Sequence, residues 1–210
     1  MITEDYFARK YGSRVQIRKA GRNELAQDFA ELGFTLGAEI GTERGRYAKV
    51  LLDANPNLHL WCVDPWICYD DNKGYKDIEG QGIHDRNLKR AKKRLDGLNC
   101  TLIKKFSMDA VKDFADESLD FVYIDGNHRL EYVIWDLVEW SKKVKPGGVI
   151  AGHDYIKFKD QHYTHIPQAL SAYFACYPVK GFHVMDQKHK NLTKEENQHL
   201  DRIRSWFFIK

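Results

Sequence analysis

Short apolar runs alternate along this chain with longer segments in which apolar residues recur every three or four positions. The runs have the length of β-strands, whereas the longer segments have the periodicity of amphipathic helices. This alternation is typical of an α/β protein with a mostly parallel, doubly wound sheet. The predicted strands are 36–41, 58–63, 100–106, 119–124, 149–152, 181–186 and 205–210, and the predicted helices are 23–33, 45–54, 85–97, 130–143 and 165–177.

The end of the chain departs from this alternation. No helical pattern separates the last two predicted strands, 181–186 and 205–210, so they fit an antiparallel hairpin at the edge of a seven-stranded sheet. The length of 210 residues suits a single domain. Within it we distinguish an N-terminal helical segment (1–34), a central core (35–155), and a C-terminal part with a lid-like segment and the hairpin (156–210).

Charge and composition narrow the class of protein. The formal net charge of +3 is too small to give the chain a general electrostatic affinity for nucleic acid. The cysteines show neither a CxxC pair nor zinc-finger spacing, so we expect reduced thiols in a cytoplasmic protein. The N-terminal residues lack the apolar segment of a signal peptide, and no apolar run reaches the ~20 residues that span a bilayer. We therefore expect no membrane partner.

Acidic residues and one histidine lie at the carboxyl ends of the predicted strands. Glu39 lies near the end of the first strand, Asp64 follows the second, and Asp125 follows the fourth. His153 and Asp154 follow the fifth. In an open α/β sheet, ligands bind outside the carboxyl ends of the strands. The sequence therefore predicts a ligand site to which these residues contribute.

Two glycines, Gly41 and Gly45, flank the turn between the first strand and the helix that follows. Glycine lets the backbone approach a ligand closely, although an ordinary turn explains the pair equally well. The spacing GxxxG is not the GxGxxG of dinucleotide sites, which disfavours a nicotinamide-dependent oxidoreductase. Asp64 follows Gly41 by roughly 20 residues, a spacing at which an acid binds ribose hydroxyls. Its alternative role is to cap the turn before Pro65.

Five short segments together resemble the class I S-adenosylmethionine (SAM)-dependent methyltransferases, which have a Rossmann-like fold. The likeness spans about residues 36–155. Within this class, the chain resembles the branch that contains the macrolide sugar O-methyltransferases and the cephalosporin hydroxylase-like proteins. It implies that the core binds SAM. The segments are EIGTERGRY (39–47), VDPW (63–66), SMDA (107–110), IDGNH (124–128) and KPGGVIAGHDY (145–155).

The resemblance implies a part of the cofactor for each of the first three segments. EIGTERGRY would surround the methionine part, VDPW would bind the ribose through Asp64, and SMDA would contact the adenine. The implied cofactor-binding residues are Glu39, Gly41, Thr42, Glu43, Gly45, Tyr47, Asp64, Pro65, Trp66, Ser107, Met108, Asp109 and Asp125.

The resemblance also implies a reaction centre at Asp125, His153 and Asp154. In metal-dependent relatives, acids at these three positions hold magnesium, and some relatives carry an acidic base where this chain has Asn127. Because His153 replaces an acid, the set of two carboxylates and an imidazole suits manganese, iron or zinc at least as well as magnesium. The alternative is metal-free catalysis, in which His153 or His128 removes the proton of a hydroxyl acceptor.

The implied reaction is O-methylation of a small molecule or a sugar, with or without a divalent metal. We expect the loops 65–83 and 155–164 to enclose the acceptor, and Trp66, Tyr69 and Tyr75 are candidates for the pocket.

The sequence also leaves open two other classes of function and the question of whether the chain forms an oligomer. A nucleic-acid methyltransferase is supported only by the basic helix 85–97, whose charges we interpret as a solvated face. A non-catalytic adenosyl-binding protein would carry the same cofactor segments. Trp135 and Trp140 would pack either on the sheet or on a partner subunit.

Overall fold

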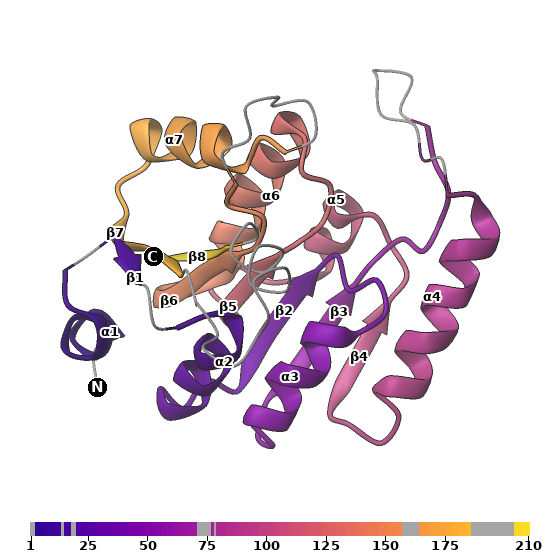
Figure 1. The fold of residues 1–210 in the computed structure, drawn as a ribbon, viewed down its shortest axis with the longest axis horizontal. Coiled ribbons are helices and arrows are strands. Elements are labelled where there is room, and N and C mark those ends of the chain that lie inside the picture. Colours follow the sequence, from indigo (N-terminus) through magenta and orange to yellow (C-terminus); the bar gives the residue numbers. More distant parts are fainter. Residues whose placement is uncertain are drawn as a thin grey trace, which may run out of the picture.

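The computed structural model describes residues 3–13, 15–17, 20–70, 77, 79–156, 164–185 and 204–210. Helices and strands alternate along them as the hydrophobic pattern predicts (Figure 1). The strands are β1 (Gln16–Ile17), β2 (Leu36–Ile40), β3 (His59–Val63), β4 (Cys100–Ile103), β5 (Leu119–Ile124), β6 (Val144–Gly152), β7 (Lys180–Met185) and β8 (Ser205–Ile209). The helices are α1 (Thr3–Tyr11), α2 (Arg22–Glu31), α3 (Arg46–Ala54), α4 (Gln81–Arg94), α5 (Ser107–Ala110), the 3₁₀ turn η1 (Val111–Asp113), α6 (Leu130–Lys143) and α7 (Ile166–Cys176).

The sheet has eight strands in the described part of the chain, in the order β1-β7-β8-β6-β5-β2-β3-β4. Strands β2 to β6 are parallel, and β8 lies antiparallel between β6 and β7. The antiparallel pairing of the last two predicted strands is therefore confirmed. The prediction of seven strands is wrong by one, because Gln16 and Ile17 add a short strand parallel to β7. A two-residue strand is too short to show an alternating pattern in the sequence.

Helices cover both faces of the sheet (Figure 1). Each face has its own hydrophobic core. On one face α1, α2 and α3 bury a core in which Phe29 stacks on Phe121, with ring centroids 4.3 Å apart. On the other face α6 and α7 bury Val122 together with Leu137. Phe121 and Val122 are neighbours in β5, so successive side chains enter opposite cores. Burial on both faces explains why these strands read as continuous apolar runs.

Some boundaries differ from those predicted. β6 begins at Val144 and includes the predicted Lys-Pro-Gly-Gly turn, where Gly147 takes a φ of +77° and donates its N–H to Lys210 O at 2.8 Å. α4 begins at Gln81, directly after Gly80 with its φ of +77°, so the predicted loop is shorter than 65–83. The parallel strand ends nevertheless lie where the sequence places them, and the turns that follow them form the site.

Three further features of the described residues concern the thiols, the basic helix and the length of the helices. All four cysteines are free thiols. Arg86 and Lys89 of the basic helix are exposed, whereas Ala91 is buried, as expected for a solvated face. None of the described helices combines the length and the apolar character needed to cross a membrane.

Candidate active site at the carboxyl ends of the strands

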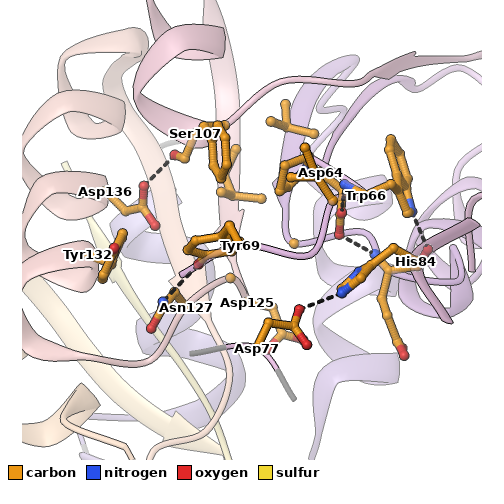
Figure 2. Close-up of a pocket in the computed structure, with 18 of the residues that line it drawn as sticks. Asp64, Trp66, Tyr69, Asp77, His84, Ser107, Asp125, Asn127, Tyr132 and Asp136 are labelled. Atoms are coloured by element: carbon orange, nitrogen blue, oxygen red, sulfur yellow. Dashed lines mark hydrogen bonds and ion pairs between the residues drawn. The ribbon is translucent and has the colours of Figure 1, made fainter. Parts of the chain in front are cut away.

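A cavity of about 510 Å³ lies at the carboxyl ends of the parallel strands (Figure 2). Its walls come from the segments after β2, β3, β4 and β5 and from helices α4 and α6. β2 has β3 on one side and β5 on the other, so the cavity lies where the strand order reverses, the usual ligand position in such sheets. The predicted cofactor residues that line it are Gly41, Glu43, Asp64, Pro65, Trp66, Ser107, Met108 and Asp125.

Gly41 brings the end of β2 against the end of β5. Its φ is +93°, and a Cβ at this position would lie 2.0 Å from the carbonyl oxygen of Asp125. The backbone is held there because Asp125 N–H donates to Ile40 O at 2.7 Å and Gly41 N–H donates to Val63 O at 2.8 Å. Glycine is therefore required by the contact between strand ends, and it also leaves this part of the cavity free of a side chain.

Asp64 connects the turns that follow β2 and β3. Its Oδ2 accepts the Glu43 N–H at 2.8 Å, and its Oδ1 accepts the Trp66 N–H at 2.8 Å. The buried Trp66 indole in turn donates its Nε1–H to Glu43 O at 2.7 Å. Burial raises the pKa of Asp64. Each carboxylate oxygen has a second lone pair, so the capping role and the acceptance of a ligand hydroxyl are compatible.

Glu39 and Thr42 lie in the same turn but do not line the cavity. Both are buried, and neither Glu39 Oε2 nor Thr42 Oγ1 has a hydrogen-bond partner among the described residues. Burial raises the pKa of Glu39 to about 8, and the negative charges of Asp125 and Asp64 add to this effect. Glu39 is thus a buried acid whose proton is retained near neutral pH.

Gly45 and Tyr47 lie at the start of α3, also away from the cavity lining. Gly45 takes a φ of +67°, and a Cβ there would lie 3.0 Å from Leu95 Cδ1 of the segment after α4. The Tyr47 hydroxyl donates to Arg22 O at 2.8 Å, and its ring lies 4.3 Å from that of Tyr123. These two residues support the turn from the core side.

The third predicted segment is divided between the cavity and the surface. Ser107 and Met108 line the cavity, whereas Asp109 lies outside the lining and pairs with Lys112 at 2.9 Å. Ser107 Oγ accepts the Trp140 Nε1–H at 2.8 Å. Trp140, one of the two tryptophans left open between the sheet and a partner, is buried.

Asp136 is a cavity residue that the sequence analysis missed. It lies on α6, is buried, and accepts a hydrogen bond from the Ser107 hydroxyl (Figure 2). Burial raises its pKa to about 7. The only signal in the sequence is an aspartate on the apolar face of a predicted helix, next to Val133 and Leu137. One polar residue among apolar neighbours does not by itself indicate a ligand site.

Aromatic side chains line the outer part of the cavity. Tyr69 contacts Phe106 edge to face at 5.2 Å, and Tyr132 contacts Trp135 in the same way at 5.6 Å. Asn127 Nδ2 donates to the Tyr69 hydroxyl at 2.9 Å, which joins the segment after β3 to the segment after β5 (Figure 2). Trp135 is 45% exposed and lines the cavity.

The two predicted acceptor loops are described only in part. Residues 71–76 with Tyr75, and residues 157–163, lie outside the described residues. Asp77 and His84 are described, and both line the cavity. His84 Nε2 lies 2.5 Å from Asp77 Oδ2, which ties the first loop to α4. Sequence reasoning missed this pair because no periodic pattern relates a loop residue to a helix position seven residues later.

Two carboxylates and two imidazoles gather beside the cavity; we call Asp125, His128, His153 and Asp154 the acid–histidine cluster. His128 Nε2 lies 3.5 Å from Asp125 Oδ1 and 3.3 Å from Asp154 Oδ2. His153 Nδ1 lies 3.2 Å from Asp154 Oδ2 and 4.0 Å from Asp125 Oδ1. The predicted reaction-centre residues therefore lie close together. The three that offer ligand atoms within 4.8 Å of one another are Asp125, His128 and Asp154, so His128 stands where the sequence analysis placed His153 as the third metal ligand.

The charges of the acid–histidine cluster stabilise one another. Burial alone would raise the pKa of Asp154, but the hydrogen bond with His153 and the charge of His128 lower it to about 2. Burial lowers the pKa of His128, but Asp125 and Asp154 outweigh this and raise it. The carboxylates therefore attract a positive charge to this position, whether a proton or a cation.

The fold and the cavity define an α/β protein of the Rossmann-like type, with its ligand site at the reversal of strand order. Residues 38–155, more than half of the chain, match the family model described as a methyltransferase domain. The chain therefore belongs to this methyltransferase family, and it is a class I SAM-dependent methyltransferase. The resemblance of the five short segments is thus confirmed at the level of the family and its cofactor.

Known proteins show the same likeness. An uncharacterized protein of Acanthamoeba polyphaga mimivirus is 29% identical over 177 residues, which cover 81% of this chain and 70% of that protein. The O-methyltransferase from Bacillus cereus in complex with SAH has a TM-score of 0.62 at 13% identity, with 100% of this chain and 90% of that chain covered. A putative caffeoyl-CoA O-methyltransferase from Staphylococcus aureus has a TM-score of 0.58 at 12% identity, with coverage of 90% and 82%.

Proposed function

We propose that this methyltransferase transfers a methyl group to a hydroxyl oxygen of a small molecule or a sugar. The position of Asp125 carries the proposal, because this residue lines the cavity and also belongs to the acid–histidine cluster. A cofactor in the cavity and an acceptor at the cluster would meet beside the same carboxylate. The O-methyltransferases among the similar structures support oxygen as the acceptor atom.

The residues of the cavity fit SAM. Its volume of about 510 Å³ is in the range of small-molecule sites. When bound, SAM supplies a methyl group on a positively charged sulfur. Gly41 would leave room for the chain of the ligand, Asp64 would accept hydrogen bonds from the ribose hydroxyls, and Ser107 with Met108 would contact the base. Glu39, Thr42, Gly45 and Tyr47 would then hold the first turn in place from the core side, and Asp109 would act only through the position of α5.

The donor set of the acid–histidine cluster fits a divalent cation. Asp125 and Asp154 would each offer a carboxylate oxygen and His128 an imidazole nitrogen, and their ligand atoms already lie within 4.8 Å of one another. This mixed set suits manganese, iron or zinc at least as well as magnesium. Such a cation would make the acceptor hydroxyl more acidic. His153 would orient Asp154 through their contact of 3.2 Å.

The acceptor must lose its proton whether or not a cation is present. His128 lies between two carboxylates, which stabilise the imidazolium that forms when the ring takes a proton. We therefore assign His128 as the base in the metal-free alternative, with His153 as the positioning residue of Asp154.

A binding measurement tests the cofactor part of the proposal. We expect S-adenosylhomocysteine (SAH) to raise the melting temperature, since a ligand at a hundred times its Kd stabilises the fold by about 2.7 kcal/mol. Asp64→Asn should weaken SAH binding, whereas Asp53→Asn, on the exposed outer part of α3, should not. Equal binding by both variants would contradict the assignment of Asp64.

A turnover measurement tests the acceptor part. The chain is incubated with SAM and with catechol, simple sugars, primary amines or RNA, each with EDTA or with Mn²⁺. We expect methyl groups only on hydroxyl oxygens, as identified by mass spectrometry of the products. Methylation of amines or of RNA without any O-methyl product would overturn the proposal.

A further inference from the structure

We infer that Asp136 determines which purine base the cavity accepts, because its Oδ2 receives a hydrogen bond from the exocyclic amino group of adenine. Asp136 lies on α6, outside the sequence segments that carry the family resemblance to a cofactor site. The inference rests on the proposed position of SAM in the cavity. It adds a specificity-determining residue to that position.

The orientation of the Asp136 carboxyl group is fixed from one side. Trp140 Nε1–H donates to Ser107 Oγ at 2.8 Å, so the hydroxyl hydrogen of Ser107 is free to point at Asp136 Oδ1. Oδ2 is directed to the other side, where a Cβ on the cavity residue Gly126 would lie 3.8 Å from it. Trp140 and Ser107 thus hold Oδ1 and leave Oδ2 for a ligand.

The packing of the fold gives no other reason for this acid. Asp136 is 4% exposed, and among the described residues neither an ion pair nor a second hydrogen bond offsets its burial. A buried carboxyl group with one donor is unfavourable, and buried polar groups in proteins are normally satisfied. A hydrogen-bond donor supplied by a ligand would satisfy the second oxygen of the carboxyl group.

The position of Asp136 matches the base end of the cofactor. Asp64, which we assign to the ribose, follows β3, and Ser107 follows the next strand, β4. Asp136 contacts Ser107, the residue that we assign to the base, and it lines the same cavity, so its carboxyl group lies beside the base position. Adenine presents an amino group that donates hydrogen bonds, whereas hypoxanthine presents a carbonyl oxygen at the same atom of the ring. The ionised carboxylate accepts from the first and repels the second, so the two bases are compared at pH 8, above the pKa of about 7 to which burial raises Asp136.

A single substitution can reverse this preference. In Asp136→Asn the side-chain carbonyl must still accept from Ser107, so the amide NH₂ takes the place of Oδ2. It then donates to the carbonyl of hypoxanthine and faces the amino group of adenine without an acceptor. The dissociation constants of SAH and of S-inosylhomocysteine, its deaminated analogue, are measured by titration calorimetry for both chains.

We expect the wild-type chain to bind SAH at least about tenfold more tightly than S-inosylhomocysteine. Asp136→Asn should abolish or reverse that ratio, and Ser107→Ala combined with Asp136→Asn should bind both ligands alike, because the amide is then free to rotate. Glu139→Gln, an exposed carboxyl on the same helix, is the matched control and should keep the wild-type ratio. Circular dichroism of each variant verifies its fold.

The outcomes separate this inference from the proposed function. A wild-type chain that binds SAH but does not discriminate between the two bases would overturn the role of Asp136 and leave the proposed function intact. A discrimination that survives Asp136→Asn would overturn it as well. A wild-type chain that binds neither ligand would overturn the position of the cofactor and, with it, this inference.

Discussion

The cofactor cavity and the acid–histidine cluster meet at Asp125 but are built in different ways. In the cavity, the polar groups near the strand ends are held by the backbone, as where Asp64 accepts the N–H groups of Glu43 and Trp66. In the cluster, side chains are held by other side chains, as where His128 lies within 3.5 Å of two carboxylates. Backbone contacts stay when a ligand leaves, whereas mutual ion pairs depend on protonation and on bound cations.

This difference teaches where each region is vulnerable. The cavity should lose its fold when the backbone is disturbed, whereas a change of charge there should alter ligand binding and leave the fold intact. The cluster should fail when one charge is removed and should leave the fold and the cofactor site intact. Substitutions that disturb either the backbone of the cavity or one charge of the acid–histidine cluster therefore test this difference.

Gly41→Ala should have the largest effect. The new Cβ would lie 2.0 Å from Asp125 O, and the φ of +93° is itself unfavourable for alanine. We expect a loss of about 5 kcal/mol in the free energy of unfolding, from overpacking and backbone strain together, with no SAH binding. Urea denaturation and titration calorimetry measure the two effects.

The matched control for this substitution is Gly97→Ala. Gly97 has a φ of +75°, but a Cβ there would meet nothing within 4 Å. It should therefore lose only about 1–2 kcal/mol, the part that comes from the backbone conformation. Equal losses at both positions would show that the contact between β2 and β5 does not organise the cavity.

The pH dependence of stability gives the second largest effect. Burial raises the pKa of Asp136 from 3.8 to about 7, so between these pH values the folded chain holds a proton that the unfolded chain has released. The free energy of unfolding should therefore fall as the pH rises from about 4 to about 7, by up to about 4 kcal/mol, and then level off. Asp136→Asn should remove this contribution and be the more stable chain at pH 8.

Urea denaturation at pH 5 and at pH 8 checks this expectation. Glu39 acts in the same direction, because burial raises its pKa to about 8. The difference between the two chains, rather than the slope of either one, therefore isolates Asp136. A constant difference at the two pH values would mean that Asp136 is ionised in the folded chain throughout this range.

The sequence predicts features that are set within one segment, but not features that depend on contacts between distant segments. The turn at Gly41 and the acid at Asp64 are each set within a few residues of one strand end, so short segments and their order predict them. Asp136 becomes a cavity residue only because α6 packs beside Ser107. Likewise, His84 enters the cavity through its contact with Asp77, and two residues of β1 join the sheet only through β7. Contacts of this kind depend on packing and have no local pattern.

Asp154→Asn should separate the two regions most clearly. Asp154 does not line the cavity, so SAH should bind with a Kd within about twofold of the wild type, while kcat/KM falls about a hundredfold through the loss of one charge beside His128. Asparagine tolerates the φ of +56° at this position, so the backbone should be unchanged. Asp125→Asn, which touches both regions, should weaken both SAH binding and turnover. Equal loss of SAH binding in the two variants would contradict the separation.

Trp135→Ala should have the smallest effect, because it changes only the rim of the cavity. It leaves unchanged both the strand-end residues held by the backbone and the acid–histidine cluster. The indole is 45% exposed, and its ring centroid lies 5.6 Å from that of Tyr132. Its loss should therefore leave the free energy of unfolding within about 0.5 kcal/mol of the wild type. We expect SAH affinity to fall by about threefold to tenfold, the usual contribution of one aromatic contact. Leu130→Ala is the control, since Leu130 is 41% exposed on the same helix but does not line the cavity. If the leucine variant loses as much SAH affinity, both residues act through the position of α6. Trp135 then does not contact the ligand directly.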